Sequence, residues 1–570
     1  MTRELNLDDI QGNVTRAYGK FSFPFARYFF FHIRSPAAGR QFLADVRKEV
    51  TTAARWNDTD NIKPATTMNV ALSFLGMVKL RVSTKTLQAF PPEFIEGMRA
   101  RAFVLGDRDT AKVEKDHDHS WCDHWDKIWR ENRLPFTLGT DTDVHIWVSI
   151  NSQSESAIEW SKPHPNFEKQ TQLLRDLCKK VPKCPLTGKP GVELMTTNGQ
   201  SGKDEYQSAN AVFEKHGDVV VPSPNEHFGL ADGIGDPVFE GQYPPDVERE
   251  KVRGRGKWMS ADRGYEGWEP IATGEFILGH PDESQELPPA TLPPEFMRNG
   301  TFMAYRKLHE NVTRFKKVVS EQAKDYAKIN KVPQEQAEEI LKAKMVGRWS
   351  DGVPLSKYPT YDSWIALQTK MGFSAADFKA NPMKAAFAQL AYMKTSDAVD
   401  FKYGDDMKGT KCPTTSHLRR VNTRDYLDPT NDVDGDNPNA TTQLNKRRRI
   451  MRRGLPYGAN DFKEKTDDTE QGVAMMLLGA SLFRQFEFIQ QQWIQYGMDF
   501  HAGNNTCPLL GDHTNHDRHT IAVEPKSGGC PFTMQLGKEK NFVDVRGGEY
   551  FFIPSMTSLR MMAMGTVDPT

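Results

Sequence analysis

The chain has 570 residues, enough for two or more domains or for one domain with long insertions. Its 74 basic and 75 acidic side chains nearly cancel, so the composition gives no support to a nucleic-acid or anionic-membrane partner. A polar, acidic start and apolar runs far shorter than the roughly 20 residues needed to cross a bilayer predict a cytoplasmic protein without membrane spans.

The predicted elements begin with a buried strand at residues 28–33 and an amphipathic helix at residues 37–50. The same order returns far downstream, with a strand at residues 302–308 and a helix at residues 312–329. This repetition predicts two copies of one strand–helix unit.

Later segments extend the duplication. The first half adds strands at residues 70–76 and 144–150 and a helix entered at 154–160, and the second half adds strands at 450–457 and 473–478 and a helix at 483–496. We therefore predict an α+β fold of two ferredoxin-like units, each an antiparallel sheet with peripheral helices. The expected division is an N-terminal unit at residues 1–225 and a C-terminal unit at 226–570.

A glycine-rich turn at residues 227–237 interrupts the long Pro- and Gly-punctuated region between the halves. It holds Asp232 between Gly229 and Gly233, which displays one carboxylate on irregular backbone. Asp-Gly pairs also mark ordinary surface turns, so the turn alone does not establish a site.

Five segments in order resemble the dye-decolourising (DyP-type) haem peroxidase family: residues 7–13, 229–233, 416–420, 450–458 and 546–555. The resemblance covers nearly the whole chain. It implies two ferredoxin-like units that enclose one heme b per chain. Gly454, where some relatives place Asn, points to the longer-chain branch of the family.

The resemblance also implies an activity. A protein of this family reduces hydrogen peroxide to water through a high-valent iron-oxo intermediate and oxidises organic electron donors such as dyes or phenols. The expected partners are these small molecules, with no nucleic acid and no membrane, and a homo-oligomer is possible.

His417 matches the proximal iron ligand of the family. Its second ring nitrogen is expected to donate to a carboxylate, because that bond fixes the tautomer and strengthens the imidazole as a ligand. Glu487 is the candidate carboxylate, and a solvated charge on a helix face is the alternative.

Asp232 and Arg452 match the two catalytic residues opposite the ligand. A carboxylate at Asp232 would move a proton between the two oxygens of peroxide, and its ordinary pKa of about 3.9 predicts activity in acid. The permanent charge of Arg452 would stabilise the departing oxygen, with Arg453 as the competing assignment.

The haem propionates are expected to meet Arg424, which lies seven residues beyond His417, or Arg419 and Arg420 beside that ligand. A guanidinium group suits a carboxylate because it can bind both oxygens. Surface salt bridges are the alternative for all three.

Three further interpretations concern metal binding, the cysteines and an alternative function. Two histidine-rich segments, at residues 117–124 and 513–519, and an aspartate-rich loop at 432–436 lack the spacing of common zinc and calcium sites. The six cysteines, with no C-x-x-C pair, are interpreted as reduced thiols. The alternative function is a non-catalytic protein that binds haem or porphyrin or releases its iron, and such a protein has no need of Asp232 and Arg452 together.

Overall fold

The computed structural model describes residues 5–107, 122–133, 140–156, 160–199, 201–260, 266–287, 291–427, 441–458, 466–513, 518–522, 530–537 and 541–565. All six cysteines are free thiols. Within these ranges no helix has both the length and the apolar character that a membrane span requires.

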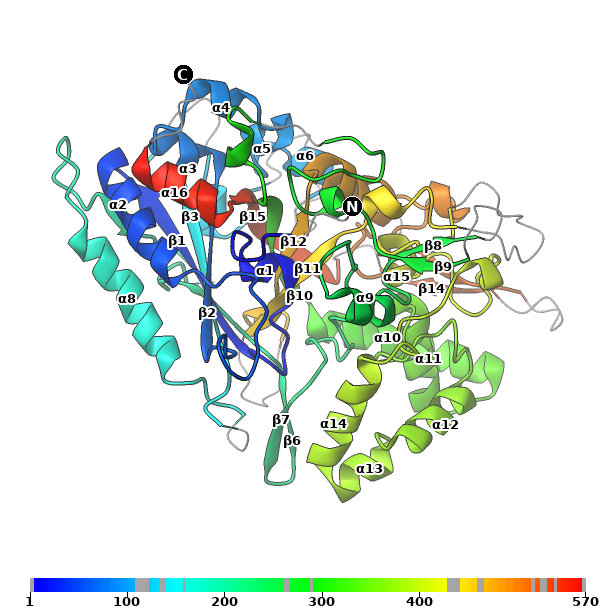
Figure 1. The fold of residues 1–570 in the computed structure, drawn as a ribbon. Coiled ribbons are helices and arrows are strands. Elements are labelled where there is room, and N and C mark those ends of the chain that lie inside the picture. The colour runs from blue at the N-terminus through cyan, green and yellow to red at the C-terminus, as the bar shows by residue number, and fades with distance from the viewer. Residues whose placement is uncertain are drawn as a thin grey trace.

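One antiparallel sheet of nine strands runs through the molecule (Figure 1), in the order β11-β12-β10-β15-β2-β3-β1-β4 with β5 also paired to β1. Its strands are β1 Phe25–Ile33, β2 Thr66–Leu72, β3 Ile146–Ser152, β4 Val192–Leu194, β5 Gln207–Asn210, β10 Thr301–Glu310, β11 Met451–Gly458, β12 Gln471–Gly479 and β15 Val543–Ile553. Three two-stranded sheets lie apart from it: β6 Phe213–His216 with β7 Val219–Pro222, β8 Lys257–Met259 with β9 Gly267–Glu269, and β13 Arg518–Ile521 with β14 Phe532–Gln535.

The predicted duplication is confirmed by the strand order. Numbered within its own half, each set of four strands follows the order 2-3-1-4, as β2-β3-β1-β4 in the first unit and β11-β12-β10-β15 in the second. This is the ferredoxin-like arrangement. The two sets join where Phe552 of β15 pairs with Leu72 of β2. The domain boundary at residue 225 stays a prediction.

The helices occupy the rims and outer faces of the sheet. The α-helices are α1 Gly12–Thr15, α2 Pro36–Val46, α3 Phe74–Lys79, α4 Thr84–Gln88, α5 Pro92–Glu96, α6 Ala102–Leu105, α7 Lys127–Arg130, α8 Asn166–Lys180, α9 Pro245–Lys251, α10 Val312–Asn330, α11 Gln334–Val346, α12 Tyr361–Met371, α13 Ala375–Ala380, α14 Pro382–Met393, α15 His417–Val421 and α16 Met556–Met564. Two π-helical segments, η7 Leu482–Glu487 and η8 Ile489–Ile494, replace the helix predicted at 483–496. Short 3₁₀ turns are η1 Arg47–Glu49, η3 Thr273–Glu275, η4 Pro294–Phe296, η5 Gly404–Asp406, η6 Lys446–Arg448 and η9 Met498–Phe500.

Two predicted boundaries were wrong for local reasons. The strand expected at 70–76 ends at Leu72, because the Ser73 hydroxyl accepts a hydrogen bond from Gly76 N at 3.1 Å and starts α3. The helix expected at 154–160 begins only at Asn166, after Pro163 and Pro165. Proline favours the first turn of a helix and disfavours its interior, so the delayed start follows from the sequence.

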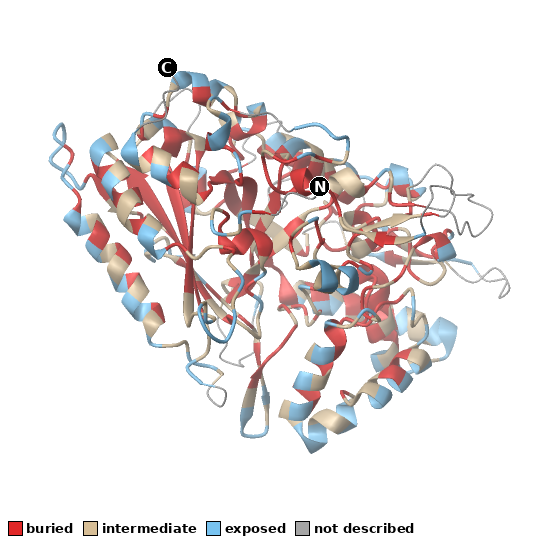
Figure 2. Ribbon diagram, viewed as in Figure 1, coloured by how far each residue is buried: buried red, intermediate tan, exposed pale blue. Residues whose placement is uncertain are grey.

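The first unit has a dry aromatic core under its helices. Phe31 of β1 packs on Phe42 of α2, with ring centroids 4.9 Å apart. The opposite face of β1 presents Tyr28 and Phe30, and both rings contact Tyr305 of β10. Figure 2 shows the strands of this region almost entirely in the buried class. The sheet therefore curves so that the two units pack on each other.

Gln11 closes the joint between the two units. Its Nε2 donates to the carbonyl oxygens of Val70, at 2.8 Å, and Pro554, at 2.9 Å, while its Oε1 accepts from Val70 N. The side chain thus ties β2 to the end of β15. A buried amide with these partners explains why a polar residue stands in the first of the five sequence segments.

Candidate active site

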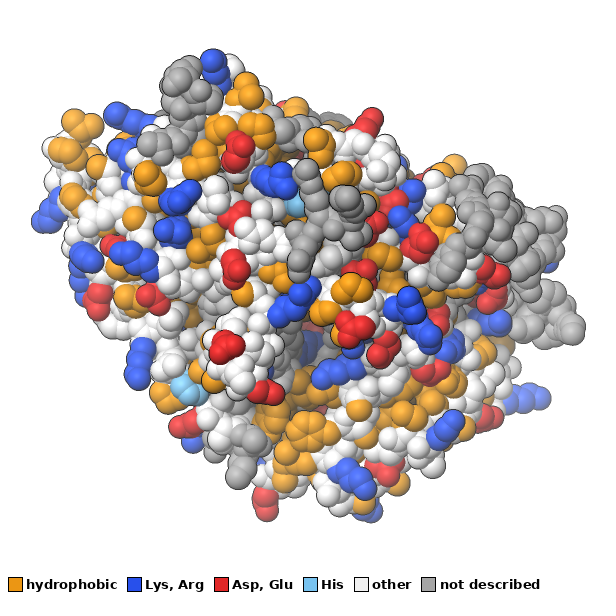
Figure 3. Space-filling view, in the orientation of Figure 1, with side chains coloured by type: hydrophobic (Ala, Val, Ile, Leu, Met, Phe, Trp, Pro, Cys, Tyr) orange, Lys and Arg blue, Asp and Glu red, His pale blue; other side chains and the backbone are white. Residues whose placement is uncertain are grey.

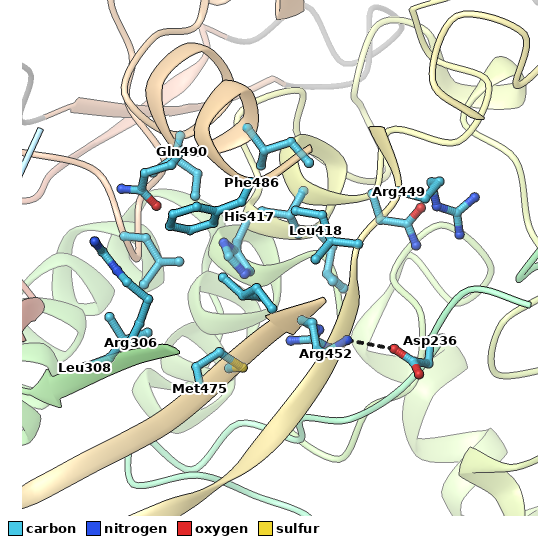
Figure 4. A pocket seen from close by; sticks show the side chains of 18 of the residues that line it. Asp236, Arg306, Leu308, His417, Leu418, Arg449, Arg452, Met475, Phe486 and Gln490 are labelled. Carbon is cyan, nitrogen blue, oxygen red and sulfur yellow. Dashed lines mark hydrogen bonds between the residues drawn. The ribbon is translucent and has the colours of Figure 1, made fainter. Parts of the chain in front are cut away.

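A cavity lies against the sheet of the second unit (Figure 4). Alternate strand residues line it because successive side chains of a strand point to opposite faces. These are Arg306 and Leu308 of β10, Met475 and Leu477 of β12, and Val543 and Val545 of β15, joined by Phe486 and Ile489 from η7 and η8. A second, smaller cavity shares His417, Leu418, Arg452 and Met475 with it, so the two form adjoining lobes of one site.

His417 enters this site as the first residue of α15. Figure 4 shows its ring and the Arg452 side chain extending into the cavity from opposite walls. Burial and the charge of Arg452 lower the imidazole pKa to about 4. The ring is therefore neutral near pH 7, the form in which a histidine nitrogen binds a metal.

The second ring nitrogen of His417 does not meet the predicted carboxylate. Nδ1 lies 3.2 Å from the sulfur of Cys507. Glu487 instead accepts hydrogen bonds from Arg101 Nη2 at 2.6 Å and from the Tyr550 hydroxyl at 2.7 Å. The assignment of Glu487 was wrong because its position on η7 points it toward α6 and β15. Nothing in the local sequence singled out Cys507.

Asp232 and Arg452 form an ion pair at the border of the two lobes. Arg452 Nη1 donates to Asp232 Oδ1 at 2.7 Å, and the two side chains keep 31% and 30% of their surface accessible. Because both residues line the smaller lobe, that surface faces the site. Gly229 and Gly233, at φ of 82° and 90°, adopt backbone that favours glycine, so the turn needs them to aim Asp232.

Charges around the pair hold Asp232 ionised. Burial alone would raise the pKa of its carboxyl, but the charges of Arg452 and Lys20 outweigh burial and keep that pKa well below its ordinary value. The same ion pair raises the pKa of Arg452. Lys20 is anchored beside the turn, where its Nζ donates to Asn225 O at 3.1 Å.

Two glutamates that the sequence did not mark shape the turn. Glu226 accepts hydrogen bonds from Phe228 N at 2.7 Å and Leu230 N at 3.0 Å, and Glu310 accepts one from His227 N at 3.2 Å. Burial raises the pKa of Glu226 to about 7, and burial beside Glu226 raises that of Glu310 well above its usual range. Two adjacent buried carboxyls that share one proton explain both shifts.

The arginines near His417 divide by their partners. Arg419 donates to Cys412 O at 2.7 Å and Asp406 O at 2.6 Å, and Arg420 donates to four backbone carbonyls, so the predicted ligand contact is wrong for Arg419. Arg453 pairs with Asp236 at 2.6 Å, away from Asp232, which resolves its competition with Arg452.

Arg449 and Arg348 line the site, where the sequence analysis expected Arg419, Arg420 or Arg424. Arg449 lines the larger lobe and Arg348 the smaller, and within the described ranges neither forms an ion pair with a carboxylate. Burial lowers the pKa of Arg449 to about 9 and of Arg348 to about 10, in each case helped by the charge of Arg424. Arg424 lies behind them, with its guanidinium over the Phe401 ring.

Three buried cations without carboxylate partners need an anion. Together with the apolar walls and the neutral imidazole, they suit a largely apolar ligand that carries a metal ion and acidic groups. Elsewhere among the described residues, no three His, Cys, Asp or Glu side chains form a metal cluster. His117, His119, His516 and the loop at 432–436 lie outside those residues.

The comparisons with known proteins agree with this geometry. The family model of the DyP dimeric alpha+beta barrel domain matches residues 9–162. A dye-decolorizing peroxidase from Mycetinis scorodonius is 26% identical over 98% of this chain and 87% of its own length. A dye-decolorizing peroxidase from Auricularia auricula-judae is 23% identical over 97% of this chain and 86% of its own length.

Solved structures share the fold over the whole chain. An ancestral D-type dye decolorizing peroxidase superposes with a TM-score of 0.66 at 22% identity, covering 98% of this chain and 99% of its own. Two others, each with a TM-score of 0.63 and coverage of 98% and 100%, are a dye-decolorizing peroxidase with an engineered heme pocket, at 20% identity, and one in complex with 2,6-dimethoxyphenol, at 19%. The domain match, the relatives and the shared fold make this chain similar to dye-decolourising peroxidases over nearly its whole length.

Proposed function

We propose that the protein is a haem peroxidase that reduces hydrogen peroxide to water and oxidises organic donors. The observation that carries the proposal is the Asp232–Arg452 ion pair, which faces the free side of the His417 imidazole across one cavity. A carrier of haem needs the histidine and the cavity, but it has no use for a proton carrier and a fixed cation opposite them.

The cavity fits one heme b per chain. His417 would bind the iron, the apolar strand residues would contact the ring, and Arg449 and Arg348 would face the propionates. Arg424 would add positive charge from behind them. Haem, when bound, supplies an iron that accepts peroxide and stores the two oxidising equivalents that organic donors later reduce.

Asp232 supplies the proton transfer. It takes a proton from one oxygen of hydrogen peroxide and delivers it to the other, which leaves as water when the O–O bond breaks. Only the ionised carboxylate can accept that proton. Because Arg452 and Lys20 keep the pKa of Asp232 low, the base stays available in acid.

Arg452 supplies the fixed charge. Its guanidinium, held at 2.7 Å from Asp232, presents permanent positive charge where the departing oxygen gains electron density. The Arg452 backbone N also donates to Asp236 at 3.0 Å, which holds β11 against the turn. The two catalytic groups therefore stay in register before peroxide arrives.

The proposal also covers the organic donors, the cellular location and the oligomeric state. Dyes and phenols are the expected donors, as suggested by the relative bound to 2,6-dimethoxyphenol. The face shown in Figure 3 intersperses cationic and anionic side chains, which favours small neutral or weakly charged donors over a polyanion. A cytoplasmic location and a homo-oligomer stay predictions.

The test is an absorption spectrum of haem-loaded protein before and after one equivalent of hydrogen peroxide. We expect a prompt shift of the main haem band in the parent, and a shift slowed by at least a hundredfold in Asp232→Asn. Haem binding with no shift and no turnover of a phenol would favour the non-catalytic alternative. Failure of the parent protein to bind haem would exclude both.

A further inference from the structure

Cys507 occupies the place beside His417 where a carboxylate was expected. Its sulfur lies 3.2 Å from Nδ1 of the imidazole, and the cysteine is fully buried. No carboxylate among the described residues forms a hydrogen bond or ion pair with His417. When Nε2 binds a metal, Nδ1 carries the proton, so the sulfur is the acceptor of that N–H group.

The backbone around the sulfur is built to present an acceptor. The backbone amides of Leu509, Leu510 and Gly511 act on the Cys507 side chain and lower its pKa, against the raising effect of burial. A side chain that accepts from amides two and three residues ahead occupies the position that aspartate often takes at the start of a turn. The local structure would therefore suit a carboxylate, and this chain places a thiol there.

The segment is also held rigidly. Cys507 N donates to Ile494 O at 2.8 Å, which fixes it to η8. Arg420, three residues after His417, donates to Asn505 O at 2.6 Å and to Trp493 O at 3.0 Å. The Arg420 guanidinium thus connects α15, which carries His417, both to η8 and to the segment that carries Cys507. The fold therefore fixes the distance between the sulfur and the imidazole.

We propose that Cys507 is the positioning residue for His417 and that its sulfur makes the imidazole a weaker donor to bound iron than a carboxylate partner would. The inference rests on the proposed function, because it assumes haem on His417. A partner that accepts the Nδ1 proton strongly raises the basicity of the ligating nitrogen. Sulfur is a weak acceptor, whereas a hydrogen bond to a carboxylate is about twice as strong as a neutral one.

The consequence is a shift in the balance between the two iron oxidation states. A weaker imidazole donor reduces the stability of iron(III) more than that of iron(II). The chain should therefore have a higher iron(III)/iron(II) midpoint potential than its own variant with a carboxylate at position 507. The same difference should lower the iron–histidine stretching frequency of the reduced protein.

The experiment compares haem-loaded parent, Cys507→Asp, Cys507→Ser and Cys507→Ala by resonance Raman spectroscopy of the reduced state and by redox titration. For Cys507→Asp we expect a higher iron–histidine frequency and a tenfold or larger shift of the redox equilibrium toward iron(III), or about 59 mV. Cys507→Ala should lower the frequency, because Nδ1 loses its acceptor, and Cys507→Ser should stay near the parent. Cys412→Ala is the matched control, since this buried thiol contacts Ser416 Oγ and not the imidazole.

Parent values in both Cys507→Asp and Cys507→Ala would overturn the inference. If Cys507→Asp does not take up haem, Ser and Ala decide: equal frequencies in these two variants would also overturn it. Failure of the proposed function would look different. A parent that shows the iron–histidine band but does not turn over peroxide and a phenol would fail as a peroxidase and leave the inference on Cys507 intact. A parent without this band, or a His417→Ala variant that keeps it, would show that His417 is not the ligand.

Discussion

The two ferredoxin-like units use the same strand order, but the described residues on one face of their first strands differ: in the first unit they meet helices, and in the second they line a cavity. In the first unit, Arg27 and Phe31 of β1 meet α8 and α2 directly, through the Arg27–Glu168 pair at 2.7 Å and the Phe31–Phe42 ring contact. In the second, the corresponding face of β10 carries Arg306, Leu308 and Glu310, all of which line a cavity. Topology therefore does not decide whether this fold has a site.

The difference comes from what joins the first strand to the second. Residues 34–65 separate β1 from β2, and α2 returns at once to cover the sheet. Residues 311–450 separate β10 from β11, and this long segment supplies Arg348, His417 and Arg449. A connection of that length can stand off from the sheet and carry its own core, which leaves room for a ligand between them.

The largest expected difference between the two units concerns haem retention when a buried histidine is replaced. His417→Ala should abolish tight haem retention, because it removes the proposed protein ligand to iron. His145 of the first unit is also buried with a lowered pKa, yet it accepts a hydrogen bond from Ile33 N and does not line either lobe of the site. His145→Ala should cost stability but keep the haem absorption. Loss of haem in both variants would contradict the assignment.

The proposed catalytic pair, Asp232 and Arg452, provides the next largest effect. Asp232→Asn should slow the reaction with peroxide about 10²- to 10⁴-fold, and Arg452→Leu about 10²- to 10³-fold. Stopped-flow absorption measures both rates. Glu168→Gln, which breaks an exposed carboxylate–arginine pair of the first unit, is the control and should leave the rate unchanged. An unchanged rate in Asp232→Asn would remove that residue from the mechanism.

Core substitutions should cost more unfolding free energy in the first unit than in the second. Phe31→Ala should cost about 3–5 kcal/mol of unfolding free energy, because Phe31 is fully buried in a close-packed core. Leu308→Ala should cost less than about 2 kcal/mol in haem-free protein, because Leu308 already borders empty space. Denaturant unfolding of the haem-free variants measures the difference. Equal costs would mean that the two faces are packed alike.

The smallest effect is a displaced pH profile. The charge of Lys20 helps to hold the pKa of Asp232 low, so Lys20→Met should raise that pKa. The base is lost as pH falls through its pKa, and the acid limb of the peroxide rate should therefore move to higher pH. Rates measured from pH 2 to 6 test this. A limb that stays in place would show that Arg452 alone sets the pKa.

The sequence predicted those parts of the molecule that rest on local periodicity and short motifs. Short apolar runs located β1, β10 and β12, and the glycines around Asp232 marked the turn. Cys507 and Glu226 were beyond its reach, because each acquires its role from a partner far away in the chain. Glu487 failed for the same reason: its helix was predicted, but the direction of its side chain depends on Arg101 and Tyr550.

The position of β15 in the sheet sets an order of events during synthesis. β15 is the last strand of the sheet along the chain, yet it lies in the middle, between β10 and β2. Until residues 543–553 have left the ribosome, both neighbours expose unpaired edges, which are sites of aggregation. The sheet therefore cannot be completed before β15 has been synthesised. A chaperone that shields the edges of β10 and β2 until then should raise the yield of folded protein.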